Sequence, residues 1–168
     1  MGGSVGDMKV IVISDTHIPV AGDKLPDGLI KELKGADFIL HAGDLLELSV
    51  LDELKKFAPC EAVSGNMDYP QVRRVLPEKK VLEIGGFKIG LIHGQGAPQT
   101  LVDFVQDKFA DEKLDCIIYG HAHKPSIVTK GGIIYFNPGS PTDHIYAPYN
   151  SFGILQITDK LTPSIIRL

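Results

Sequence analysis

The sequence contains no tryptophan, two cysteines and three arginines among its 168 residues. Cys60 and Cys116 both lie in apolar stretches and are too few for a disulfide framework. We therefore expect both cysteines to be reduced core residues and the protein to be cytoplasmic. A net charge of −4 argues against a nucleic-acid polymer as partner, because such binding relies on clustered Lys and Arg. No apolar run approaches the roughly 20 residues that span a bilayer, so no membrane association is expected.

The length suits one domain with a substantial buried core. We expect a single domain over residues 8–168, preceded by a flexible tip over residues 1–7 that is rich in small residues. That tip has no basic region followed by an apolar one, so a secretory signal is not predicted. The sequence leaves the oligomeric state open, and a homo-oligomer is among the alternatives.

The chain is organised around an apolar, β-branched run that begins at Lys9 and ends in Ser14-Asp15-Thr16-His17. A strand that is apolar on both faces indicates the centre of a sheet covered on both sides. Ligands of open α/β folds bind at the carboxyl ends of such strands. Asp15 and His17 are two residues apart, so in an extended segment both side chains would project to the same side. A carboxylate and an imidazole held side by side form half of a metal site.

The first half of the chain alternates short apolar runs with helical stretches, which is typical of βα units with parallel pairing. Apolar residues recur there at helical spacing, and glycine or proline follows each helical stretch. The predicted elements are a strand at Val10–Ser14, a helix at Asp27–Leu33, a strand at Asp37–His41, a helix at Leu48–Phe57 and a strand at Cys60–Val63.

The second half carries hairpin signals, because Gly85-Gly86 and Gly131-Gly132 each separate two apolar runs. We therefore predict one mixed α/β domain, with parallel pairing early in the chain and antiparallel pairing later. The later elements are strands at Lys79–Ile84 and Phe87–Ile92, a helix at Thr100–Phe109, and strands at Asp115–Tyr119, Ile127–Thr129, Ile133–Phe136, Gly153–Thr158 and Ser164–Arg167.

Five of the predicted strands are followed directly by side chains that can bind a metal. Any one of them has an ordinary explanation as a cap or turn residue, but strand ends of one sheet converge in space. Oxygen and imidazole donors without thiolate suit Mn, Fe, Zn or Ni better than a structural zinc. Seven donors are too many for one small cation, so two metals sharing a carboxylate are predicted. The donors are Asp15, His17, Asp44, Asn66, His93, His121 and His123.

These motifs resemble those of the calcineurin-like metallophosphoesterases, in that family's order: Asp15-x-His17, Gly43-Asp44, Gly65-Asn66-x-Asp68, His93 and Gly120-His121-x-His123. The resemblance spans nearly the whole chain from Met8 and looks like the compact phosphodiesterase branch, which also contains the retromer scaffold subunit. It implies an α/β fold, a four-layer α/β sandwich of two mixed β-sheets flanked by helices. It also implies a first metal held by Asp15, His17 and His123. A second metal would be held by Asn66, His93 and His121, with Asp44 bridging the two.

One position departs from the family pattern. Many members have a histidine after the asparagine of the third motif, which is thought to protonate the leaving group, whereas this chain has Met67. Relatives in the small phosphodiesterase branch also tend to lack that histidine, so the resemblance implies a phosphodiesterase more than a broad monoesterase. The expected catalytic residues are Asp44, Asn66 and Asp68, and Asn66 and Met67 are expected to contact the substrate.

For four further polar residues, an ordinary structural role competes with or replaces a functional one. His41 lies inside a predicted strand and is expected to pack or to support a ligand, and His144 is expected to be solvated. Lys124 either reaches a substrate phosphate or is an exposed lysine. Asp68 either holds a metal ligand by hydrogen bonding or is a turn residue.

The sequence thus predicts a dinuclear, metal-dependent phosphodiesterase acting on small molecules or nucleotides. Two divalent ions, with Mn²⁺ expected first and Fe, Zn or Ni as alternatives, would bind phosphoryl oxygens and activate a hydroxide for in-line attack. A non-catalytic protein-binding scaffold of the same fold and a phosphomonoesterase are the alternatives. The scaffold relative lacks part of the imidazole set that this chain keeps, which favours catalysis.

Overall fold

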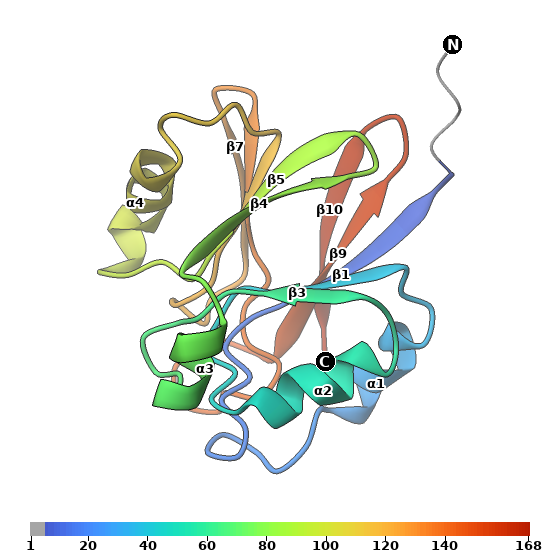
Figure 1. The fold of residues 1–168 in the computed structure, drawn as a ribbon, viewed down its shortest axis with the longest axis vertical. Coiled ribbons are helices and arrows are strands. Elements are labelled where there is room, and N and C mark those ends of the chain that lie inside the picture. Colours follow the sequence, from blue (N-terminus) through green and yellow to red (C-terminus); the bar gives the residue numbers. More distant parts are fainter. Residues whose placement is uncertain (1–5) are drawn as a thin grey trace.

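Two five-stranded sheets lie against each other in the computed structural model, which describes residues 6–168 (Figure 1). The first has the order β10-β9-β1-β2-β3 and the second the order β4-β5-β6-β8-β7. Residues 1–5 of the predicted flexible tip lie outside the described residues. The strands of the first sheet are β1 (Met8–Ile13), β2 (Phe38–His41), β3 (Cys60–Ala62), β9 (Ser151–Ile157) and β10 (Leu161–Arg167). Those of the second are β4 (Lys79–Ile84), β5 (Phe87–Ile92), β6 (Cys116–Ile118), β7 (Ser126–Lys130) and β8 (Ile133–Asn137).

Strand β1 is buried on both faces, as its sequence predicts. Ile11 and Ile13 pack on one side with apolar residues of two helices, α1 (Asp27–Leu33) and α2 (Leu48–Lys55). Val10 and Val12 point to the other side, into the core between the two sheets. The period-2 alternation of a strand therefore divides one apolar run between two cores.

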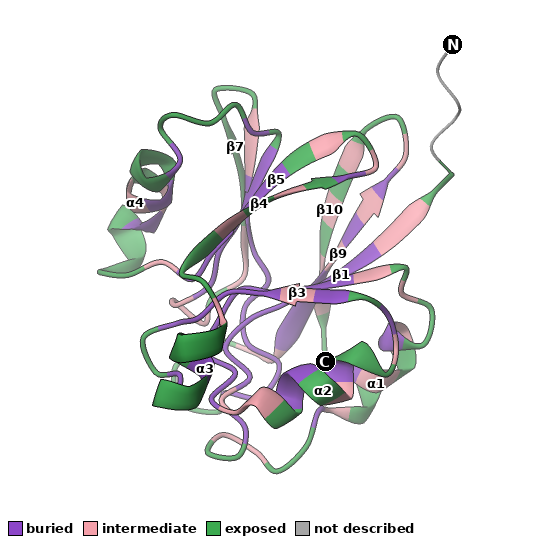
Figure 2. Cartoon of the chain, in the orientation of Figure 1, coloured by how far each residue is buried: buried purple, intermediate pink, exposed green. Residues whose placement is uncertain are grey.

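The outer face of the second sheet is covered by α4 (Leu101–Lys108), which follows a short 3-10 helix, η1 (Pro98–Thr100). Val105 of this helix packs in a third apolar cluster with Ile117 of β6 and Tyr135 of β8. The layers are helix, sheet, sheet and helix, so the predicted four-layer sandwich is confirmed. Figure 2 shows the same division, with buried residues along the strands and exposed residues over much of the helical surface.

The predicted pairing is wrong in the second half of the chain, which is not antiparallel throughout. Strand β6 pairs in parallel with both β5 and β8, because α4 and β7 return the chain to the same edge before each new strand begins. Antiparallel pairing is confined to the hairpins and to β9, which returns to the first sheet beside β1. Both Gly-Gly hairpin turns are as predicted, with positive φ at all four glycines.

Helix α3 (Pro70–Val75) is absent from the sequence-based prediction. Only Val72 of its six residues is buried, so it has no apolar periodicity that would reveal it. Its start is nevertheless favourable, because proline at the first helical position lacks only an N–H that has no partner there. Within residues 6–168, no helix has the length and apolar character needed to cross a membrane.

Candidate metal centre

The ends of four strands and the loops after them meet at one edge of the sandwich. Backbone hydrogen bonds tie the loops together: Asp15 N–H donates to Gly43 O and His17 N–H to Asp44 O, both at 3.0 Å. The N–H of Gly120 donates to His93 O, also at 3.0 Å. These bonds bring the segments after β1, β2, β5 and β6 to the same place, as expected for strand ends of packed sheets.

The local backbone differs from the extended segment that the sequence analysis assumed. Strand β1 ends at Ile13, and Asp15 and His17 have φ of 56° and 43°, in the left-handed region. Their side chains do approach each other, but this results from the positive φ of both residues and not from the alternation of side chains along a strand. Six non-glycine residues of the described chain have positive φ, and five of them are predicted metal ligands. Such conformations cost free energy and cluster at functional sites. The six are Asp15, His17, Asp44, Leu46, His121 and His123.

Two glycines of the motifs are required by close approach. A Cβ atom at Gly65 would collide with the carboxylate of Asp44, and one at Gly120 would collide with Ser14 Oγ and Asp15 Oδ2. The glycines that precede the predicted ligands therefore make room for the carboxylates that face the site.

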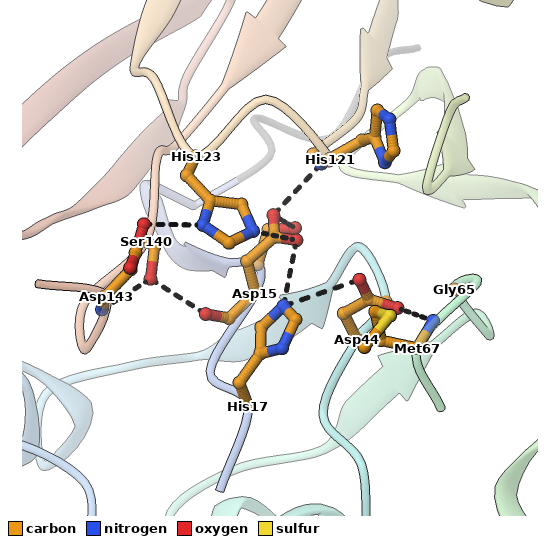
Figure 3. Close-up of polar contacts among 12 residues, drawn as sticks. Asp15, His17, Asp44, Gly65, Met67, His121, His123, Ser140 and Asp143 are labelled. Atoms are coloured by element: carbon orange, nitrogen blue, oxygen red, sulfur yellow. Dashed lines mark hydrogen bonds and ion pairs between the residues drawn. The ribbon is translucent and has the colours of Figure 1, made fainter. Parts of the chain in front are cut away.

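Five of the seven predicted ligands come together as two groups that share Asp15. Figure 3 shows Asp15 with His17, His123 and Asp44 around it. One group is Asp15, His17 and His123, and the other is Asp15, Asp44 and His93. Asp15 Oδ1 lies 3.2 Å from His123 Nε2, 3.5 Å from His17 Nε2 and 3.7 Å from His93 Nε2. Asp44 Oδ2 lies 3.4 Å from His17 Nε2 and 3.1 Å from His93 Nε2, so it contacts histidines of both groups.

Each carboxylate uses one oxygen for hydrogen bonds and turns the other toward the histidines. Asp15 Oδ2 accepts from Ser14 Oγ at 2.7 Å and from the N–H of His121 at 3.0 Å. Asp44 Oδ1 accepts from the N–H of Met67 at 2.8 Å. The inward oxygens, Asp15 Oδ1 and Asp44 Oδ2, are thereby oriented and left available.

Two of the imidazoles are oriented in the same way. His93 Nδ1 donates to Ala42 O at 2.8 Å, and His123 Nδ1 donates to Asp143 Oδ2 at 2.7 Å. A neutral imidazole that donates through Nδ1 presents a lone pair at Nε2. The two Nε2 atoms point at carboxylate oxygens, an arrangement that favours a proton or a metal cation between the nitrogen and the oxygen.

Unpaired polar atoms give an independent test of whether a cation fits. Four buried side-chain atoms of the described chain have no hydrogen-bond partner: the hydroxyl of Tyr135, in the apolar cluster under α4, and three atoms of this site, Asp15 Oδ1, His17 Nε2 and His93 Nε2. Buried polar atoms are almost always paired, and all three of these point into the same site. Carboxylate oxygens and imidazole nitrogens are a donor set that suits divalent transition metals. The residues therefore fit divalent metal binding.

The titration of these groups reflects the same electrostatics. Burial opposes charge on His17 and His93, but the facing carboxylates of Asp15 and Asp44 outweigh it and raise the pKa of each imidazole to about 9. Burial likewise raises the pKa of the two carboxyls, yet the surrounding histidines outweigh it and hold both pKa values far below the usual range. The site is built to hold two anionic carboxylates and needs positive charge between them.

The other two predicted ligands are not brought into either group. His121 Nε2 points to Gly96 O at 3.1 Å, although its ring lies 5.4 Å from that of His93. Asn66 is exposed at the mouth of the site. The group that contains His93 is completed by Asp15 and Asp44, and His121 and Asn66 stay predicted ligands.

The remaining sequence candidates occupy distinct positions. Asp68 is buried and accepts hydrogen bonds from the backbone N–H groups of Asp44, Leu46 and Gly65 at 2.7–3.0 Å, so it shapes the loop that carries Asp44. His41 is buried, accepts from Gly43 N–H at 3.1 Å and lies 3.0 Å from Thr16 Oγ1, and burial lowers its pKa to about 4. It packs beneath the site, as predicted.

His144 and Lys124 are both exposed. His144 lines the cavity in front of the metal centre, whereas Lys124 is not among the residues that line it. The expectation that Lys124 reaches a bound phosphate therefore has no geometric support in this conformation.

Sequence reasoning missed Asp143, which is buried beside His123. Its Oδ2 accepts from His123 and from the N–H groups of Tyr146 and Ala147, and its Oδ1 accepts from the N–H of Ile145. Two neighbours of Asp143 also reach the site: Ser140 donates to Asp15 O at 2.8 Å and Thr142 to Thr16 O at 2.6 Å. No strand ends directly before Asp143, because β8 ends at Asn137, so the pattern that identified the other ligands could not find it.

A cavity of about 660 Å³ opens in front of the metal centre. His17, Asp44 and His123 line it, as do Asn66, Met67 and the segment from Asp143 to Tyr146. A second, smaller cavity of about 320 Å³ adjoins it on the other side of Asn66. The metal centre is thus open to a small molecule.

The family follows from this fold and site. The calcineurin-like phosphoesterase superfamily domain matches residues 8–160, and the chain belongs to that family. A probable metallophosphoesterase of Methanothermobacter thermautotrophicus is 39% identical over 95% of this chain and 92% of its own length. Another, from Methanocaldococcus jannaschii, is 38% identical over 96% of this chain and 82% of its own length.

Solved structures share the fold. Vps29 of Entamoeba histolytica, solved in complex with Zn²⁺, has a TM-score of 0.74 at 28% identity, covering 95% of this chain and 99% of that one. An archaeal phosphodiesterase has a TM-score of 0.73 at 23% identity, covering 96% of this chain and all of the other. The fold is therefore the calcineurin-like α/β sandwich, in a metallophosphoesterase.

Proposed function

We propose that this metallophosphoesterase hydrolyses phosphodiesters with two divalent ions, Mn²⁺ being the ion expected first. One observation carries the proposal. Two three-residue groups share Asp15, and three of their inward atoms are buried without a hydrogen-bond partner. A single ion would leave one group unoccupied, and a purely structural site would be closed, whereas this one faces a cavity of about 660 Å³.

Asp15, His17 and His123 would hold one ion, and Asp44 and His93, with Asp15, would hold the other. When bound, the ions would supply the positive charge that phosphate oxygens require and the Lewis acidity that lowers the pKa of water. That charge is needed because no Lys or Arg is among the described residues that line the cavity at the centre. His121 and Asn66 also line the cavity and would supply further donors to the second ion or to the substrate.

Diesters are favoured over monoesters for two reasons. Met67 stands at the cavity where many relatives have a histidine, and a thioether cannot protonate a leaving group. Esters whose leaving group departs as a stable anion should then react best. A diester also carries one negative charge fewer than a monoester dianion, so it meets less repulsion at a site lined by Asp15 and Asp44.

The test is hydrolysis of bis(p-nitrophenyl) phosphate by protein freed of metal with a chelator and then loaded with Mn²⁺. We expect turnover only after loading, and elemental analysis giving close to two Mn per chain. Asp103→Asn, far from the centre in the exposed pair with Lys130, is the matched control and should keep full activity. Saturating metal at one ion or fewer per chain contradicts the dinuclear proposal, and absence of turnover by the loaded protein contradicts the hydrolase.

The second candidate function is a protein-binding scaffold of the same fold. It is favoured by the solved Vps29, which is named for protein sorting and was crystallised with Zn²⁺. This relative has the same fold and binds a metal, although its name refers to protein sorting and not to catalysis. Two bound Mn²⁺ per chain together with no hydrolysis of any aryl diester would favour the scaffold.

A further inference from the structure

Four large apolar side chains stand exposed around the cavity in front of the metal centre. Val20, Met67, Ile145 and Tyr146 have exposed fractions of 74%, 54%, 81% and 76%, and all four line the cavity. They are four of the ten large apolar side chains exposed within residues 6–168. Single exposed apolar residues are ordinary, but a group of them at one cavity marks a binding surface. We call these four residues the apolar wall.

The apolar wall belongs to the same cavity as the metal ligands. His17, Asp44 and His123 line it too, so a substrate with its phosphate at the centre shares one cavity with the wall and can place an ester group against it. The volume of about 660 Å³ lies within the roughly 300–1,000 Å³ that is usual for small-molecule sites. Because the wall offers no cation, it suits an uncharged ester group.

Tyr146 is held at a defined position in this wall. Its ring centroid lies 6.0 Å from that of His123, at an interplanar angle of 79°. Asp143 Oδ2 accepts from the backbone N–H of Tyr146 at 3.0 Å and from His123 Nδ1 at 2.7 Å, so one carboxylate oxygen ties the backbone of Tyr146 to the side chain of a predicted metal ligand. Ile145, next to it, is held by Asp143 Oδ1 at 2.8 Å. A ring that lies edge-on beside His123 and is otherwise exposed can receive a second ring.

We infer that the apolar wall selects phosphodiesters that carry a flat, uncharged aromatic ester group, with Tyr146 as the residue against which that ring packs. The inference rests on the proposed function, since it names the substrate class of the same site. Offset or edge-to-face packing of two rings, added to the burial of the apolar wall, favours the aromatic ester over a methyl ester.

Two substrates with one leaving group test the selection. Methyl p-nitrophenyl phosphate and phenyl p-nitrophenyl phosphate both release p-nitrophenolate and differ only in the second ester. We expect wild type to prefer the phenyl ester about tenfold or more in kcat/KM, mainly through KM. Tyr146→Ala should remove most of that preference and Tyr146→Phe should keep it. Ile127→Ala, which truncates an exposed isoleucine of β7 outside the cavity, is the control and should leave the preference unchanged.

Binding gives a readout that does not depend on turnover. Isothermal titration of Mn²⁺-loaded protein with phenylphosphonate and methylphosphonate measures the contribution of the ring alone. We expect wild type and Tyr146→Phe to bind the phenyl ligand several-fold more tightly, and Tyr146→Ala to bind both equally. Tyr146 is exposed, so its removal should leave the thermal midpoint within about 2 °C of wild type.

The outcomes separate the two proposals. If wild type and Tyr146→Ala each hydrolyse the two diesters with equal kcat/KM, the inference is overturned and the proposed hydrolase activity stands. The apolar wall would then be available to a protein partner. Preferential phenylphosphonate binding that is lost in Tyr146→Ala, without hydrolysis of either diester, supports the inferred selection and overturns the hydrolase. Equal binding of the two phosphonates by wild type overturns the inference whatever the rates.

Discussion

Asp143 is predicted to set the affinity of one metal position and not the other. Its carboxylate accepts four hydrogen bonds, one from His123 Nδ1 and three from the backbone of residues 145–147. The bond to His123 fixes the tautomer that presents Nε2 toward Asp15 Oδ1, 3.2 Å away. Residues that orient a metal ligand in this way typically contribute 10–100-fold to metal affinity or activity.

Two substitutions at this position should differ in size. In Asp143→Asn the amide oxygen can occupy the Oδ2 position, which keeps three bonds and loses only the one from Ile145 N–H. The bond from His123 loses its charge assistance, so we expect about a tenfold loss of affinity at the position of Asp15, His17 and His123. Asp143→Ala removes all four bonds, and the loss there should approach about 100-fold.

The measurement is a Mn²⁺ titration of metal-free protein in competition with a fluorescent chelator, which yields two stepwise dissociation constants. Only one constant should change, because His93 is oriented by Ala42 O and makes no contact with Asp143. Asp103→Asn, an exposed carboxylate paired with Lys130, should leave both constants unchanged. The reasoning is refuted if both constants weaken equally in Asp143→Asn, or if neither changes in Asp143→Ala.

Three further predictions concern single residues. Asp44→Asn keeps the acceptor for Met67 N–H but removes the negative charge between His17 and His93. Hydrolysis of an aryl diester should therefore fall at least about 10³-fold while the circular dichroism spectrum is unchanged. Activity within tenfold of wild type contradicts the assignment of Asp44 as a metal ligand. Met67→His should raise turnover of alkyl monoesters and reduce the dependence of rate on leaving-group pKa, and unchanged ratios of monoester to diester rates would remove Met67 from the argument. Burial raises the pKa of the Cys60 and Cys116 thiols to about 12, so both should resist a thiol reagent at pH 8 until the protein is unfolded, and rapid labelling of native protein would contradict their burial.

The sequence by itself determined most of the elements, and its resemblance to the family implied the four layers. Apolar runs such as Val10–Ile13 are readable because a strand buried on both faces needs apolar side chains at every position. The Gly-Gly pairs identified both hairpins, because only residues that tolerate positive φ form such tight turns. The sequence did not predict α3, because only one of its residues is buried. It also did not predict the parallel pairing of β6, because strand direction depends on where the intervening segments pack.

For the site, the sequence determined which residues stand at the strand ends, and five of seven predicted ligands converge in two groups. Only the tertiary structure decided that Asp15 belongs to both groups, that His121 points to Gly96 O, and that Asp68 faces backbone amides. It alone placed Asp143 beside His123, 20 residues away along the chain. The physical reason is that local pattern specifies where strands end, whereas side-chain direction follows from left-handed backbone and from hydrogen bonds between segments distant in sequence.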